Sequence, residues 1–206
     1  MSNKLNILSN VSAMAVVTLD ENSFDIMCTK LATDILASGY SPDVVVSIAT
    51  GGDYVAAKMR NKMDANFYSV KKTRSSTKTK NSLFGRFLFA FIRLLPYFIL
   101  NILRKIEHYF LISKPTCDNS SADNLFSLSF VDELSGAECI LIVDDAIDSG
   151  KTIHAVRESI RAVVKEKVVI KVASLVVTTE DPIVYPDYYM YENTLVRFPW
   201  SKDFKK

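Results

Sequence analysis

The amino-acid sequence predicts an α/β fold, in which a mostly parallel, twisted sheet is flanked by helices. Two observations predict it. Short runs rich in β-branched residues alternate with segments of helical periodicity, as expected of parallel strands that are buried on both faces. Two of these runs lead directly into the glycine-containing loops "ATGGD" and "DDAIDSGKT", and a helix-like segment follows each loop. Repeated strand, loop and helix units of this kind are typical of a parallel sheet.

The first half of the chain begins this alternation. Apolar residues recur at helical spacing over residues 23–36, with Asn22 or Ser23 available as the N-cap. A strand is expected over residues 44–48, and the glycine turn after it leads into a second helix that begins near Asp53.

The rest of the chain continues the pattern with three further strands. Strands are expected over residues 66–70, 139–143 and 167–177, and a helix over residues 153–164 follows the second of them. The strands lie in one sheet, so the two glycine-containing loops are expected at its carboxyl edge, where both can face one ligand.

Composition and cysteine content indicate a cytoplasmic globular protein. The chain has 206 residues, of which 49% are hydrophobic, so one core over residues 1–206 is expected. Its three cysteines are odd in number and far apart, which excludes a disulfide framework and a paired-cysteine metal site. The first residues lack the apolar run of a secretory signal.

Charge is distributed unevenly along the chain. Residues 71–114 contain ten Lys or Arg and one acid, Glu107. Subtracting these from the chain's 25 basic and 23 acidic residues leaves 15 basic and 22 acidic residues elsewhere, although the net charge is only +2. A basic segment therefore lies inside an otherwise acidic protein.

The loop after the third predicted strand concentrates polar groups. Asp144, Asp145 and Asp148 lie beside residues 149–152, "SGKT", which open a helix. A helix N-terminus favours a phosphate through its unpaired N–H groups and its dipole. The carboxylates require hydroxyl groups or a cation as partners. A sugar phosphate with vicinal hydroxyls satisfies both demands.

Two other interpretations of this loop are weaker. A Walker A loop needs glycine where Asp145 stands, and the dinucleotide fingerprint GxGxxG is absent. A merely polar turn leaves the three acids and the Ser/Thr pair unexplained. A phosphate-binding loop remains the better interpretation.

The segment "ILIVDDAIDSGKT" resembles the 5-phosphoribosyl-1-diphosphate (PRPP) motif of the type I phosphoribosyltransferases. "PDVVVSIATGGDYVAAKM" is similar to the pyrophosphate-loop region of that family, and "YPDYYMYENTLVRFPW" resembles the end of its purine-type members. The resemblance covers most of the chain outside residues 72–125. It implies a type I phosphoribosyltransferase-like fold and transfer of a phosphoribosyl group from PRPP to a nitrogenous base, with Mg²⁺ as cofactor and release of diphosphate.

The resemblance also implies roles for single residues. Asp144 and Asp145 would hold the ribose hydroxyls, and Mg²⁺ indirectly through the substrate. Asp148 would be the catalytic residue, near the base as a proton acceptor or donor. The 5-phosphate would be bound by Ser149, Gly150, Lys151 and Thr152, and the pyrophosphate loop would consist of Thr50, Gly51 and Gly52.

The base-binding part departs from the purine-type pattern. Thr178 and Thr179 stand where relatives usually place a lysine that reads a 6-oxo group, and Leu195 stands where they place a stacking Trp. Tyr188, Leu195 and Val196 are therefore the expected base-pocket residues, and the acceptor is left open.

The largest departure is the insertion over residues 72–125. Lys71, Lys72 and Arg74 are expected in a flexible loop that closes over PRPP. The following segment, residues 83–112, reads as a basic amphipathic helix. Its polar side chains form one narrow stripe, which contains Arg86, Arg93, Tyr97, Asn101, Arg104 and His108.

Three roles are open for residues 83–112: contact with a membrane surface, an interface to a protein or a second copy, and a cover over the chain's own active site. A clean membrane span is disfavoured because two central arginines cost about 5 to 7 kcal/mol, which offsets about 4 to 8 kcal/mol from the apolar residues. Pro96 adds a kink. The basic cluster has no layout for base-specific nucleic-acid reading.

Three functional hypotheses follow. The first is an active phosphoribosyltransferase. The second is a PRPP or nucleotide sensor that has lost transfer. The third is an effector subunit of a multi-protein prokaryotic system, similar to the phosphoribosyltransferase-like proteins associated with retrons, in which the inserted helix docks on a partner or a membrane.

Overall fold

The structure is a computed structural model that describes residues 14–71, 95–113 and 130–205; side chains are described in these ranges except for residues 109–113. Some residues with predicted roles lie outside the described ranges, namely Lys72, Arg74 and residues 83–94. The described parts divide into two compact units.

The sheet unit contains the described parts of residues 25–74 and 120–193. The small unit contains those of residues 1–24, 75–119 and 194–206. Each unit is compact by itself, and the prediction of one domain over residues 1–206 stays a prediction.

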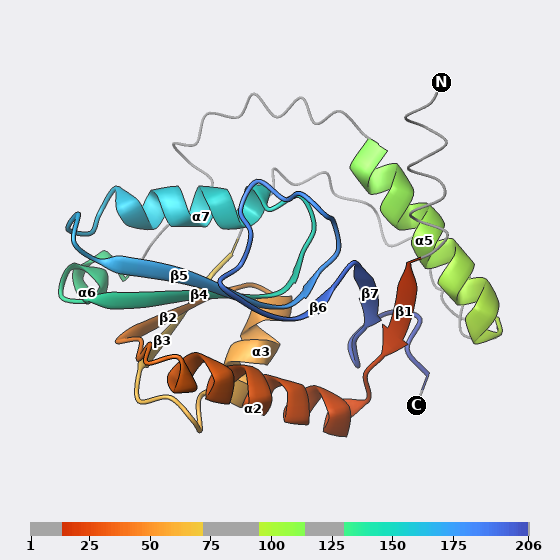
Figure 1. Ribbon diagram of the computed structural model, residues 1–206, viewed down its shortest axis with the longest axis horizontal. Helices are drawn as coiled ribbons and strands as arrows, with labels where there is room; N and C mark the ends of the chain where they lie inside the picture. Colours follow the sequence, from red (N-terminus) through yellow and green to blue (C-terminus); the bar gives the residue numbers. More distant parts are fainter. Residues whose placement is uncertain (1–13, 72–94, 114–129, 206) are drawn as a thin grey trace, which may run out of the picture. The chain divides into compact units, whose positions relative to one another are not determined.

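The sheet unit is built on a five-stranded parallel sheet with the strand order β3-β2-β4-β5-β6 (Figure 1). The strands are β2 (Val44–Ile48), β3 (Asn66–Val70), β4 (Cys139–Ile147), β5 (Val169–Val177) and β6 (Tyr188–Glu192). Every neighbouring pair is parallel, which confirms the predicted α/β fold class. β2 and β3 have the predicted bounds.

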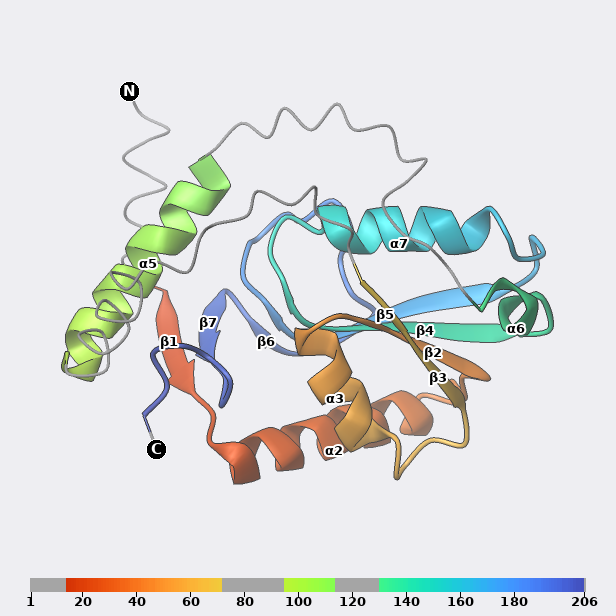
Figure 2. The same ribbon diagram turned by 180° about the vertical axis from the view of Figure 1, so that it is seen from behind.

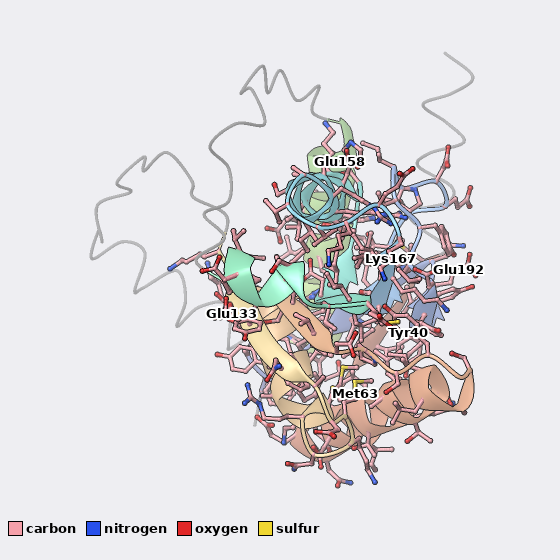
Figure 3. All side chains as sticks on the ribbon, turned by 90° about the vertical axis from the view of Figure 1, so that its left-hand side faces the viewer. Tyr40, Met63, Glu133, Glu158, Lys167 and Glu192 are labelled. Carbon is pink, nitrogen blue, oxygen red and sulfur yellow. The ribbon has the colours of Figure 1, made fainter. Side chains whose placement is uncertain are left out.

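Helices cover both sides of this sheet. They are α2 (Glu21–Ala37), α3 (Gly51–Met59), α6 (Val131–Ser135) and α7 (Lys151–Arg161). Figures 1 and 2 show α7 on one side and α2 and α3 on the other. In the end-on view of Figure 3, Glu158 of α7 and Met63, which follows α3, mark these opposite sides.

Both faces of the central strands β2, β4 and β5 are largely buried, as β-branched strands without polar alternation predict. Val44 and Val46 of β2 lie in the core cluster together with Ile153 of α7. Val45 of β2 and Leu141 of β4, which point to the opposite face, are 0% exposed. Each such side chain contributes about 1.5–3 kcal/mol when it is fully buried. The core therefore holds the strand ends, and the loops after them, in place.

Several predicted boundaries were wrong. α3 begins at Gly51 rather than near Asp53, α7 runs over Lys151–Arg161 rather than residues 153–164, and β5 begins at Val169 rather than at residue 167. α2 begins at Glu21 because Asp20, not Asn22 or Ser23, caps it: the Asp20 carboxylate accepts a 2.8 Å hydrogen bond from the backbone N–H of Ser23. β4 extends beyond Val143 through Ile147, because Asp144, Ala146 and Ile147 continue the pairing with β5.

The small unit contains a parallel pair of strands and one long helix. The elements are β1 (Ala15–Thr18), β7 (Thr194–Arg197) and α5 (Tyr97–Ser113). Arg197 of β7 is 1% exposed. Its guanidinium donates hydrogen bonds to Thr18 Oγ1, Asn101 Oδ1 and Asp203 Oδ2, each 2.8 Å long. One buried arginine therefore joins β1, α5 and the segment after β7.

The polar stripe of α5 contacts the rest of the small unit. Asn101 accepts from Arg197, and Arg104 donates to Asp203 and to the backbone carbonyl of Val196, at 2.5 and 2.7 Å. The opposite side of the helix exposes large apolar side chains, namely Phe98 (64%), Ile102 (52%), Leu103 (46%) and Ile106 (46%). Among the described helices, none has both the length and the apolar character needed to cross a membrane.

Candidate functional site

Two loops meet at the carboxyl edge of the sheet. The first follows β2 and contains residues 49–52, and the second runs from Asp144, near the end of β4, to Thr152. β2 and β4 are hydrogen-bonded neighbours, with Val46 opposite Ile142 and Ser47 opposite Val143. Parallel strands end at the same edge, so the pairing brings the loops together.

The loops are in close contact at two glycines. A Cβ atom on Gly51 would overlap the carboxyl group of Asp145, and one on Gly52 would lie 2.5 Å from the carbonyl oxygen of Val143. Only glycine allows the backbone of the first loop to approach the second this closely. The peptide bond between Ala49 and Thr50, just before these glycines, is cis. The exposed Thr50 makes no side-chain cap bond to α3.

Asp144 and Asp145 form an adjacent carboxyl pair. The backbone N–H of Asp145 donates a 2.9 Å hydrogen bond to Asp144 Oδ1. Burial, and next the neighbouring charge of Asp145, raises the pKa of Asp144 well above its ordinary range. Burial also raises the pKa of Asp145. Hydroxyl donors or a cation would relieve this cost, so the pair is suited to a ligand that supplies them.

The second loop encloses a small cavity where α7 begins. The cavity has a volume of about 130 Å³ and is lined by Asp144 and by residues 146–153. Gly150 is the N-cap of α7 and has a φ of +72°, a backbone conformation that favours glycine. A helix N-terminus supplies N–H donors for an anion, and here they border the cavity.

The segment after β5 fixes this loop from one side. The backbone N–H of Ile183 donates a 3.0 Å hydrogen bond to the carbonyl oxygen of Ser149. A Cβ atom on Gly150 would lie 2.8 Å from the backbone nitrogen of Val184. Gly150 is therefore required both for its φ and for the close approach of this segment.

Asp148, which is exposed, is held by the two threonines that follow β5. The hydroxyl of Thr178 donates a short hydrogen bond to Asp148 Oδ1, and that of Thr179 donates to the Asp148 carbonyl oxygen at 2.7 Å. Thr178 is 4% exposed. Sequence reasoning noted these threonines only as departures from a family pattern. The β4–β5 pairing, which places Ile147 opposite Val177, is the signal that could have joined them to Asp148.

The residues expected in the base pocket are not brought together in the sheet unit. Tyr188 lies at the beginning of β6, opposite Ala173, whereas Asp148 follows the end of β4. Its hydroxyl bonds to Ser38 Oγ and to Lys171 Nζ, at 2.7 and 2.8 Å. The other two residues, Leu195 and Val196, are buried in β7 of the small unit.

The flexible-loop residues are only partly described. Lys71 is exposed directly after β3, while Lys72 and Arg74 lie outside the described residues. Their role in closing over a ligand stays a prediction.

A resident metal site is not present in the described part of the chain, where no cluster of three or more His, Cys, Asp or Glu side chains could hold an ion. The adjacent carboxylates of Asp144 and Asp145 nevertheless fit Mg²⁺ when a ligand supplies most of the oxygen atoms, because Mg²⁺ is commonly bound by one or two carboxylates together with phosphates.

No protein-family model matches the sequence, and no curated protein matches it. Solved structures do match. A purine phosphoribosyltransferase from Pyrococcus horikoshii has a TM-score of 0.56 at 20% identity, covering 94% of this chain and 97% of that one. A xanthine-guanine-hypoxanthine phosphoribosyltransferase from Helicobacter pylori has a TM-score of 0.53 at 16% identity, covering 90% and 92%.

A third similar structure is that of a hypothetical protein from Neisseria gonorrhoeae with bound ppGpp, with a TM-score of 0.54 at 15% identity, covering 91% of this chain and 89% of that one. These likenesses show the fold, which is that of the type I phosphoribosyltransferases.

Proposed function

We propose that this chain, whose fold is that of the type I phosphoribosyltransferases, binds PRPP together with Mg²⁺ and transfers the phosphoribosyl group to a nitrogenous base, with release of diphosphate. One observation carries the proposal: the glycine-containing loop after β2 contacts the acidic loop after β4, at Gly51 and Asp145. The second loop is the one whose sequence predicts phosphate binding. A ligand with a phosphate, vicinal hydroxyls and a diphosphate matches the two loops: the phosphate fits the start of α7, the hydroxyls fit the carboxyl pair, and the diphosphate fits the glycine-containing loop.

Each part of the two loops has a role in this proposal. The N–H groups at the start of α7, in residues 149–152, bind the 5-phosphate. Asp144 and Asp145 accept hydrogen bonds from the ribose hydroxyls, and residues 50–52 bind the diphosphate through backbone N–H groups. When bound, Mg²⁺ neutralises charge on the departing diphosphate. Asp148 faces the incoming base and accepts a proton from it or orients it.

A second function, binding of PRPP or a nucleotide without transfer, is favoured by a specific observation. Thr178 and Thr179 stand where purine-type relatives usually place a lysine, and both bond to Asp148. A similar structure, which contains bound ppGpp, is that of a hypothetical protein rather than of a named transferase. In this alternative the loops keep their ligand, and the chain acts as a sensor or as an effector subunit of a larger system.

The experiment that tests the proposal has two steps. Calorimetric titration with PRPP and Mg²⁺ measures binding, and a diphosphate-release assay over a panel of nucleobases measures transfer. Binding with release supports a transferase. Binding without release supports the second function, and no binding overturns both.

A double variant assigns the binding to the proposed residues. Asp144→Asn with Asp145→Asn is expected to lower PRPP affinity at least about tenfold, because neutral amides bind hydroxyls and a cation less strongly than carboxylates. Asp34→Asn makes the same chemical change at an exposed position of α2 and serves as the matched control. Unchanged affinity in the double variant would contradict the assignment of the carboxyl pair.

A further inference from the structure

Two threonine hydroxyls of the described residues lie beside Asp148, and both bond to it. Residues 178–183 run alongside residues 147–149: the backbone N–H of Thr178 donates to the Ile147 carbonyl at 2.9 Å, and that of Ile183 donates to the Ser149 carbonyl at 3.0 Å. This places the hydroxyls of Thr178 and Thr179 next to Asp148.

Both hydroxyl protons are already used. Thr178 donates its proton to the Asp148 carboxylate, and Thr179 donates its proton to the Asp148 carbonyl. A hydroxyl has one proton and two acceptor lone pairs, so neither threonine can also donate to a ligand. The residues that follow, Glu180 and Asp181, are exposed acids. We define the acceptor corner as Asp148 with residues 178–181; its side chains offer acceptors and no cation.

We propose that the acceptor corner selects bases that carry an exocyclic amino group over those that carry an oxo group at the same position. The inference rests on the proposed function, because it takes the base to lie against Asp148. An amino group donates to the carboxylate in a charge-assisted hydrogen bond. An oxo group would instead face a second acceptor, and both would lose their hydration without gaining a partner.

Thr178 acts in this selection as a positioning residue. It is 4% exposed, so it contacts a ligand little itself, but its hydroxyl fixes one carboxylate oxygen of Asp148 and leaves the other for the base. Sites built to hydrogen-bond one polar group discriminate strongly against analogues that lack it.

The test compares two nucleotides that share a ribose 5-phosphate and a purine ring system. Adenosine 5′-monophosphate carries a 6-amino group, and inosine 5′-monophosphate carries a 6-oxo group. Calorimetric titration of the full chain is expected to give at least about tenfold tighter binding of the adenosine nucleotide. Equal affinities, tighter binding of the inosine nucleotide, or binding of neither would overturn the inference.

Variants of Thr178 separate positioning from general stability. Thr178→Val removes the hydroxyl at nearly constant volume and is expected to bring the ratio of the two affinities close to one. Thr178→Ser restores the hydroxyl and is expected to restore the preference. Ribose 5-phosphate, which has no base, serves as the folding control and is expected to bind all three proteins equally. An unchanged ratio in the valine variant would overturn the positioning role.

The two proposals fail in different ways. Nucleotide affinity requires no turnover, so absence of diphosphate release with every base would remove the transferase but not the amino preference. Release that is faster with hypoxanthine than with adenine would overturn the amino preference and leave the transferase.

Discussion

Gly51 and Asp145 lie so close together that no side chain fits between them, since a Cβ atom on Gly51 would overlap the Asp145 carboxyl group. The two residues belong to loops that are about 90 positions apart in sequence and are joined by the pairing of β2 with β4. This contact sets how far apart the proposed diphosphate and ribose positions can be.

Gly51→Ala is therefore expected to lower PRPP affinity at least about tenfold, which corresponds to about 1.4 kcal/mol. The added methyl group forces the Asp145 carboxyl group to move, while the backbone of the sheet keeps its pairing. Calorimetric titration with PRPP and Mg²⁺ measures the loss. Gly136→Ala is the matched control, because a Cβ atom there meets nothing within 4 Å. Wild-type affinity in the Gly51 variant would mean that this contact does not position Asp145.

Asp144→Asn is expected to stabilise the ligand-free protein at neutral pH. The pKa of Asp144 is raised from its ordinary 3.8, mainly by burial, so the native state binds more protons than the unfolded chain. Stability is therefore lost as the pH rises from about 4 through the raised pKa. The asparagine variant avoids this loss, and single stabilising changes commonly yield about 0.5–2 kcal/mol.

Thermal unfolding followed by circular dichroism checks this pH dependence. The Tm of the Asp144 variant should exceed that of the wild type at about pH 7.5, and the difference should shrink toward about pH 4. A difference that is the same at both pH values would mean that ionisation of Asp144 is not its cause.

Arg197→Met is expected to destabilise the small unit by about 1–3 kcal/mol, because it removes buried hydrogen bonds while Asp203 keeps its ion pair with Arg104. The change removes the hydrogen bonds to Thr18, Asn101 and Asp203. Urea unfolding measures the loss. Lys30→Met breaks the exposed pair with Asp34, whose side chains are 59% and 48% exposed, and should cost under about 1 kcal/mol.

Two leucines of α5 test which side of the helix is covered. Leu100 is 2% exposed and Leu103 is 46% exposed. Leu100→Ala should cost about 2–5 kcal/mol in urea unfolding, because it leaves a cavity in the small unit. Leu103→Ala makes the same chemical change on the outer side and should cost far less. Equal losses would mean that the helix presents a different face to β1 and β7.

The parts of the fold that depend on local pattern could be predicted from the sequence. The strands at residues 44–48 and 66–70 are short runs rich in β-branched or aromatic residues next to turns, and their bounds were correct. β1 and β7 have four residues each and pair across more than 170 positions, so no window of the sequence contains their signal. The cap at Asp20 was missed because Asn22 and Ser23 are equally good capping residues.

The candidate site likewise has features that the sequence predicts and features that it does not. Parallel topology alone predicts that the two glycine-containing loops end at one edge of the sheet, and the structure brings Gly51 to Asp145. The partnership of Thr178 with Asp148 depends on the register between β4 and β5, which composition and periodicity leave undefined. The burial of Arg197 is equally hidden in the sequence, because arginine is almost never fully buried unless it is paired.

The three hydrogen-bond partners of Arg197 leave the ribosome at different times during synthesis. Thr18 and Asn101 leave the ribosome well before Arg197 and Asp203, which follow Asn101 by about 100 residues. At translation rates of about 5–20 residues per second, Arg197 and Asp203, which bind the polar stripe of α5, are synthesised roughly 5–20 s after Asn101. β2 and β4 can pair within that time. We therefore expect α5 of the nascent chain to expose its unpaired polar stripe during that time.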